Sequence, residues 1–133
     1  MSRERLETWT KVMAIERVAV GGLVGLAPGL AVKVFGLPLD ADTPPLRMLA
    51  RLFAVRNVLL GVLLWQARDD RSRLAHAALL NAATDGADAL AAAVPLVRRQ
   101  GMDRGAISAM ATALTAAAGF LRLRFLAEAD PER

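Results

Sequence analysis

The 133-residue chain has no cysteine, no tyrosine and a single histidine, and only 5% of its residues are aromatic. The absence of cysteine excludes disulfides, thiolate nucleophiles and cysteine-ligated metal sites. One histidine and two aspartates on another helix face are too small a ligand set for a first-row metal, so we expect no metal or other cofactor. Base stacking relies on aromatic side chains, so we expect no nucleic-acid binding despite a formal net charge of +4.

The chain is instead rich in aliphatic residues. Hydrophobic residues make up 55% of it, above the ~45–50% of typical soluble domains. They gather into four segments at about residues 12–35, 46–67, 74–97 and 105–126, each close to the roughly 20 residues that cross a bilayer. The length fits one domain over residues 1–133. The sequence therefore predicts an all-α, four-helix transmembrane bundle.

Short polar connections separate the four segments and contain residues that start or stop helices. Asp42 or Thr43 is placed to cap the second helix, Ser72 the third, and Gly101 and Asp103 flank the last connection. Short connections make neighbouring helices antiparallel, in an up-down-up-down order with both termini on one side. Lys and Arg are more numerous on that side, so we expect a multi-pass protein of the cell (inner) membrane with cytoplasmic termini.

A soluble, alanine-rich four-helix bundle is the main alternative. The charge-free runs of the first and fourth segments are about 15 and 17 residues long, slightly short for a span unless the flanking cations extend their charged ends to the interface. A soluble helix, however, carries a polar face along its whole length. The first and fourth segments lack such a face, which favours the membrane.

Small residues recur at intervals of four in the first segment. Gly21, Gly25 and Gly29 form a stripe where another helix can approach closely. The fourth segment repeats this spacing at Ala109, Ala113 and Ala117. Either the first and fourth helices pack on each other, or the glycines bind a second copy or a partner membrane protein. Pro28 is expected to kink the first helix.

Charged residues lie inside the second and third segments. Arg56 and Asp85 lie at similar depths, near the bilayer midplane, when counted at about 1.5 Å per residue from the outer helix ends. A lone charge there costs at least ~2.5–3.5 kcal/mol, so we predict that they pair. Arg51 and Asp88 differ in depth by about 6 Å, which a long arginine side chain can cover, and we predict a second pair.

The polar residues of the third segment share one helix face, because Asn81, Asp85 and Asp88 are four and three residues apart. We predict that this face and the second helix form a mid-membrane pocket for a lipophilic small molecule with a polar or anionic group. The candidate ligand-binding residues are Arg51, Asn57, Asn81 and Thr84. The candidate catalytic residues are Arg56, Asp85 and Asp88.

Three functions remain open for this cluster. Acid–base chemistry on the bound molecule, such as hydrolysis, isomerisation or cyclisation with epoxide ring opening, would use the aspartates. A non-catalytic accessory or assembly subunit of a membrane complex would use the glycine stripe instead. Ion transport is a third reading, although four short helices leave little room for alternating access. The charged pairs could also serve only to set the register of two helices.

Two further polar features lie near the cytoplasmic end. Glu16 and Arg17 are about one turn inside the first segment, where Arg122 or Arg124 could meet Glu16 in an interfacial pair. His76 lies about half a turn of the helix away from the face of the aspartates, so we do not expect it to act with them.

The Arg-rich stretch "RLFAVRNVLLGVLL" followed by "NAATDGADAL" resembles small bacterial integral membrane proteins of a domain-of-unknown-function family, which are distantly similar to DoxX-like four-helix proteins. The matching positions are Arg51, Arg56, Asn57, Asp85 and Asp88. The resemblance covers nearly the whole chain. It implies a four-helix fold and a membrane location, and it supplies no catalytic residue.

Overall fold

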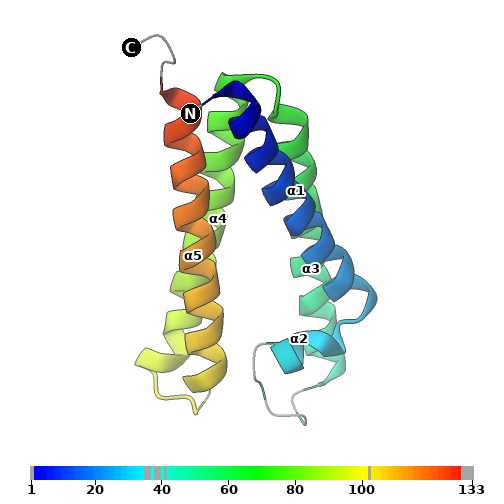
Figure 1. Cartoon of the computed structure of the whole chain (residues 1–133). Helices are drawn as coiled ribbons and strands as arrows, with labels where there is room; N and C mark the ends of the chain where they lie inside the picture. The colour runs from blue at the N-terminus through cyan, green and yellow to red at the C-terminus, as the bar shows by residue number, and fades with distance from the viewer. Residues whose placement is uncertain (1, 35–36, 38–39, 41, 102, 130–133) are drawn as a thin grey trace.

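The structure is a computed structural model that describes residues 2–34, 37, 40, 42–101 and 103–129. These residues form four long helices and one short helix, with no strand among them (Figure 1). The long helices are α1 (Arg3–Leu26), α3 (Pro44–Ala67), α4 (Arg71–Val97) and α5 (Asp103–Glu128), and the short one is α2 (Gly29–Val34). The predicted all-α fold with four long helices is confirmed.

The second, third and fourth predicted segments agree with α3, α4 and α5. Thr43 caps α3, its side chain accepting a hydrogen bond from the Leu46 N–H. The cap of α4 is Asp70 rather than the predicted Ser72, and its carboxylate accepts from the Arg73 N–H at 3.0 Å. Asp70 immediately precedes the helix, so its side chain can accept from an N–H of the first turn, as an N-cap requires.

The first predicted segment is divided in two. The helix α1 begins at Arg3, well before the predicted start, and ends at Leu26, where the Ala27 N–H closes the last turn on the Leu23 carbonyl. Pro28 follows and has no N–H to continue the helical hydrogen bonds, so the expected break occurs here. The predicted end of this segment at Phe35 lies outside the described residues.

The helices pack as two pairs, α1 along α3 and α5 along α4. Glycines allow the close approach of α1 and α3, since a Cβ at Gly21 would lie 2.7 Å from the Ala54 carbonyl oxygen. A Cβ at Gly61 of α3 would likewise lie 2.9 Å from the Ala14 oxygen. The expected packing of the first helix on the fourth is therefore wrong, because α3 occupies the glycine stripe.

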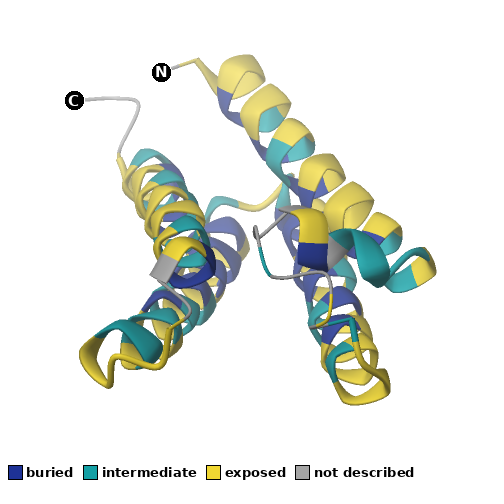
Figure 2. Cartoon of the chain, turned by 90° about the horizontal axis from the view of Figure 1, so that it is seen from below, coloured by how far each residue is buried: buried dark blue, intermediate teal, exposed yellow. Residues whose placement is uncertain are grey.

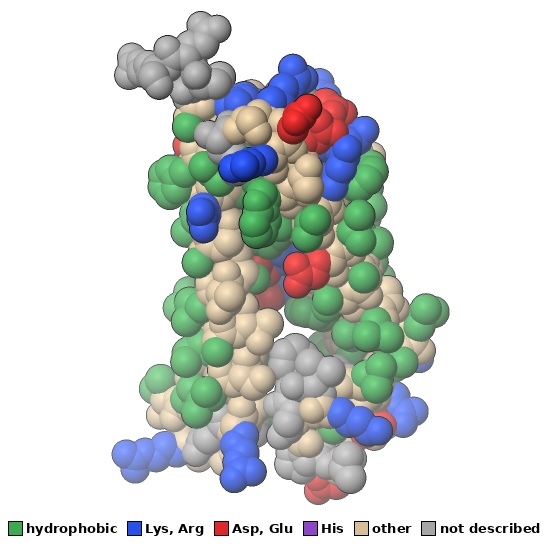
Figure 3. Space-filling view, viewed as in Figure 1, with side chains coloured by type: hydrophobic (Ala, Val, Ile, Leu, Met, Phe, Trp, Pro, Cys, Tyr) green, Lys and Arg blue, Asp and Glu red, His purple; other side chains and the backbone are tan. Residues whose placement is uncertain are grey.

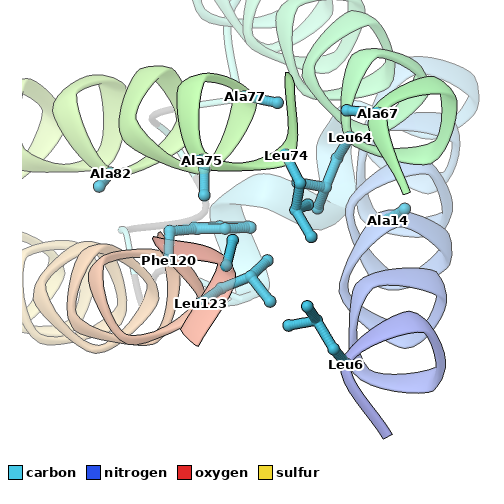
Figure 4. Close-up of a cluster of buried hydrophobic side chains, with 12 residues drawn as sticks. Leu6, Ala14, Leu64, Ala67, Leu74, Ala75, Ala77, Ala82, Phe120 and Leu123 are labelled. Atoms are coloured by element: carbon cyan, nitrogen blue, oxygen red, sulfur yellow. The ribbon is translucent and has the colours of Figure 1, made fainter. Parts of the chain in front are cut away.

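Among the described residues, the two pairs share a core toward the end where the termini lie. Twelve buried apolar residues from α1, α3, α4 and α5 form this cluster (Figure 4). Its labelled members include Leu6, Leu64, Leu74, Phe120 and Leu123. We call this part of the molecule the closed half.

Toward the opposite end the pairs diverge, as the view from below shows (Figure 2). The second core cluster, Val24, Ala50 and Ala54, belongs to α1 and α3 alone. At this end α2 lies between the two pairs (Figure 1), and residues 89–93 of α4 are four alanines and Leu90. We call this part the open half.

Large apolar side chains cover the outside of both pairs (Figure 3). Two helices of the described chain are long and apolar enough to cross a membrane: α3, and residues Arg104–Glu128 of α5. Only 28% and 17% of the residues in their most apolar windows are buried. The apolar surface of these helices is thus mostly directed outward, where a soluble monomer would normally be polar.

Candidate functional site

The most buried charged residues form a pair between α1 and α4. Arg17 donates two hydrogen bonds to the Asp85 carboxylate, from Nη1 to Oδ2 at 2.9 Å and from Nη2 to Oδ1 at 2.5 Å. The two side chains are 6% and 8% exposed. The guanidinium also lies over the Phe120 ring of α5, 4.8 Å from its centroid, which places a cation on the negative face of the ring. Three helices therefore meet at this pair.

A second pair joins α3 to α4. Arg56 donates from Nη1 to Asp88 Oδ1 at 2.8 Å and from Nη2 to Oδ2. The side chains are 36% and 30% exposed, so this pair is more open than the first. Arg56 also lies over the Phe53 ring at 5.0 Å.

Both predicted pairings are wrong. Arg56 meets Asp88, which by the same depth count lies about level with it, and Asp85 lies one turn closer to the closed half, where α1 brings Arg17. Arg51 is exposed on the outside of α3. It lies about 140° around the helix from Arg56, too far to reach α4 from the same face.

Arg17 is the functional candidate that the sequence reading missed. The sequence predicts an interfacial position for Glu16 and Arg17, yet only Glu16 is exposed. Arg124 pairs with Glu128 on its own helix at 2.9 Å. A signal for Arg17 did exist. The buried positions of α1 recur every three or four residues, at Leu6, Thr10, Ala14, Arg17, Gly21 and Val24. Arg17 thus lies in the middle of the buried stripe.

The polar candidates of the predicted pocket mostly bond to their own helices. Asn57 donates to the Phe53 carbonyl, Asn81 to the Ala77 carbonyl, and Thr84 to the Leu80 carbonyl, each four residues back. None of these three side chains has a hydrogen bond to either ion pair within the described chain. The two Arg–Asp pairs, which we call the Arg–Asp layer, therefore have no hydrogen bonds to the candidate ligand-binding residues Asn57, Asn81 and Thr84.

Some polar atoms of this region remain unmatched. Arg17 Nε, Arg56 Nε and Asn81 Oδ1 are buried and have no hydrogen-bond partner among the described residues. Buried polar groups are nearly always hydrogen-bonded in proteins. Two donors beside the ion pairs and one acceptor on α4 are thus available to a bound molecule or to water.

Two surface grooves lie away from the ion pairs. One, of about 600 Å³, is at the terminal end and is lined by Ser2, Arg3, Leu6, Glu7, Arg68, Asp69 and Arg71. The other, of about 330 Å³, lies between α3 and α4 and reaches Asn81. Among the residues with described positions, no three His, Asp or Glu side chains come together as a metal site would require.

At the far end, Asp42 anchors the start of α3. Its two carboxylate oxygens accept hydrogen bonds from Arg47 at 2.8 and 2.9 Å. This hydrogen bonding to the charged form lowers the pKa of Asp42 below its ordinary value. The pair is exposed and serves the helix start rather than a site.

No family model matches the chain, and no curated protein or solved structure gives a significant match. The resemblance to DoxX-like proteins stays an expectation from the sequence. The two ion pairs that join α1 and α3 to α4 are the most distinctive chemical feature of the described chain.

Proposed function

We propose that this protein is a small multi-pass protein of the cell membrane that binds a lipophilic molecule in its open half, with the polar part of that molecule at the Arg–Asp layer. The observation that carries the proposal is the position of the two ion pairs. Arg17–Asp85 and Arg56–Asp88 both cross from the α1/α3 pair to α4. They lie beside the end of the shared core, beyond which the buried cluster of Val24, Ala50 and Ala54 belongs to α1 and α3 alone.

Membrane insertion is supported by the apolar exterior and by the two helices that meet the length and hydropathy requirement. We propose that α1 and α4 complete four spans, since Arg17, Asp85 and Asp88 are paired, while Glu16 is exposed and is the charge of α1 that this proposal leaves without a partner in the described chain. Trp9 and Trp65 are exposed in the closed half, close to the helix termini, as residues of an aromatic belt would be. The cationic excess at this end gives cytoplasmic termini.

The open half suits a lipophilic ligand because many of its side chains are apolar and small. Residues 89–93 of α4 include four alanines, and Phe53 of α3 packs against the α1/α3 core. Binding pockets in proteins are mainly apolar, with a few polar groups that fix the orientation of the ligand. The arginine Nε donors beside the layer are such groups for a carbonyl, hydroxyl or anionic oxygen.

The geometry favours binding over catalysis. Each aspartate uses both carboxylate oxygens to hold an arginine, so neither presents a free oxygen as a general base. The glycine stripe proposed for a partner protein is covered by α3. The acid–base role and the accessory-subunit role remain sequence-based predictions without a structural observation that favours them.

The proposal is tested by native mass spectrometry of the protein purified in mild detergent. The wild-type protein should retain one molecule beyond lipid and detergent. Replacing the more open pair with alanine, Arg56→Ala with Asp88→Ala, should lower its occupancy about tenfold or more, since a lost charge-assisted hydrogen bond is worth about 1.5–3 kcal/mol. The matched control is Arg51→Ala, which removes an exposed arginine from the same helix.

A second variant tests the apolar part of the site. Ala92→Phe places a bulky ring on α4 at a partly buried position one helical turn beyond Asp88. It should displace the bound molecule while leaving the fold intact. Equal occupancy in wild type, the double alanine variant and Ala92→Phe would show that the open half is not the binding site.

A further inference from the structure

The groove between α3 and α4 in the closed half combines a charged mouth with an apolar wall. Its volume of about 330 Å³ is at the small end of ligand-binding sites. The polar residues of the groove are Gln66, Ser72, Arg73, His76 and Asn81. The apolar residues are Leu63, Ala67, Ala77 and Leu80. This is the composition of a site for an amphiphile.

The mouth carries groups that can bind an anion. Arg73 is 77% exposed along its side chain, and its nearest carboxylate contact is a long one, Nε to Asp70 Oδ2 at 3.5 Å. The His76 ring places Nδ1 2.8 Å from the Ser72 carbonyl oxygen. Because a carbonyl oxygen only accepts, Nδ1 carries the hydrogen and Nε2 of the neutral ring is an acceptor, so Arg73 is the anion-binding group of the mouth. Asp70 itself is committed to capping α4.

The wall and the inner end of the groove complete the pattern. Leu63 and Leu80 are 47% and 56% exposed and line it on the two helices. Asn81, about one and a half turns deeper than His76 along α4, is fully buried, and its Oδ1 accepts no hydrogen bond from any described residue. A buried acceptor without a donor can accept a hydrogen bond from an N–H or O–H group that a ligand brings.

We propose that this groove binds an anionic phospholipid that has a free hydroxyl on its glycerol. The phosphate lies against Arg73, an acyl chain follows Leu63 and Leu80, and the hydroxyl donates to Asn81. Phosphatidylglycerol and single-chain phospholipids both have this chemistry. The site is separate from the open half and needs only that the helices contact lipid.

The test uses the whole protein in nanodiscs of phosphatidylcholine doped with one second lipid, and counts bound lipids by native mass spectrometry. Phosphatidylglycerol or a single-chain phosphatidic acid should be bound in preference to phosphatidylcholine. Arg73→Gln should lower this preference about fivefold, the usual effect of one basic residue at a lipid surface. Arg122→Gln is the control, because Arg122 is exposed in the same closed half on α5.

Two further comparisons test the hydrogen bond to Asn81 and identify the lipid hydroxyl that makes it. Asn81→Leu should abolish the preference for phosphatidylglycerol over diacyl phosphatidic acid, which lacks the hydroxyl, while keeping the preference over phosphatidylcholine. Comparing phosphatidylglycerol with the single-chain lipid identifies which hydroxyl is used, and free glycerol phosphate should not compete. The proposal is overturned if wild type shows no preference, if Arg73→Gln and Arg122→Gln lose it equally, or if glycerol phosphate displaces the lipid.

Discussion

The two arginine–aspartate pairs have the same geometry and differ in their surroundings. Arg17 and Asp85 are enclosed by three helices, whereas Arg56 and Asp88 border the open half. A buried charge that loses its partner keeps the full desolvation penalty, and breaking such a pair costs about 3–5 kcal/mol. A half-exposed pair loses less because solvent can replace the partner.

Asp85→Ala is therefore expected to be the more damaging of the two aspartate substitutions. It should lower the free energy of unfolding by about 3–5 kcal/mol, and Asp88→Ala by less than half as much. Both are measured by denaturant titration in the same mild detergent, with helical circular dichroism as the signal. The opposite order would indicate that Arg56–Asp88 contributes more than Arg17–Asp85 to holding α4 against the α1/α3 pair.

Removing both charges of the buried pair distinguishes a missing interaction from an orphaned charge. Arg17→Met combined with Asp85→Leu should recover most of the stability lost in Asp85→Ala, since apolar residues of similar size often replace buried ion pairs without cost. Failure of the double variant to recover would mean that the pair contributes net stability.

At the scale of helices, the pairing of α1 with α3 decides which charges can meet. The stripe that contains Gly21 and Gly25 faces α3, and Gly61 of α3 faces back toward α1. Close backbone contact on both sides fixes the register of this pair. In that register Arg17 projects past α3 to α4, which no count along a single helix could indicate.

A designed disulfide tests this register directly in a chain that has no native cysteine. A Cβ at Gly25 would lie 3.3 Å from the Ala54 Cβ, slightly inside the 3.5–4.5 Å typical of disulfides. Gly25→Cys with Ala54→Cys should cross-link within the monomer on mild oxidation, seen as a mobility change on a non-reducing gel.

The matched control places the second cysteine on α5. Gly25→Cys with Ala109→Cys represents the packing of the first helix on the fourth that the small-residue pattern suggested, at about the same distance from the terminal end. It should not cross-link within the monomer. The opposite result would contradict the packing of α1 on α3.

At the scale of the whole molecule, two helix pairs share one core at the terminal end and separate toward the other (Figure 1). The outside of both pairs is apolar over much of its length. In water such a surface would drive aggregation, whereas in a bilayer it is the surface in contact with lipid.

We therefore expect the protein to remain in the membrane fraction after alkaline carbonate washing and to require detergent for extraction. A reporter that is active only in the cytoplasm should be active when it is fused to either terminus, because the cationic residues concentrate at that end. Recovery of a stable protein in the soluble fraction without detergent would contradict the membrane assignment.

The sequence by itself determined the helices. Hydrophobic segment length, Thr43 as a cap and Pro28 as a break located most helix boundaries, because helix formation depends on hydrogen bonds four residues apart and on residues at the ends. It also identified Arg56, Asp85 and Asp88 as charges that need partners, since an unpaired charge in apolar surroundings is costly wherever the helix lies.

Only the tertiary structure decided which partners these are. Arg17 and Asp85 are 68 residues apart in the chain. Their contact depends on the packing of α1 on α3 and on the point at which the two helix pairs begin to diverge. The small residues of the first and fourth segments were compatible with several pairings, since a glycine stripe accepts any close helix. The steric fit between Gly21, Gly61 and the opposing backbones selects one of them.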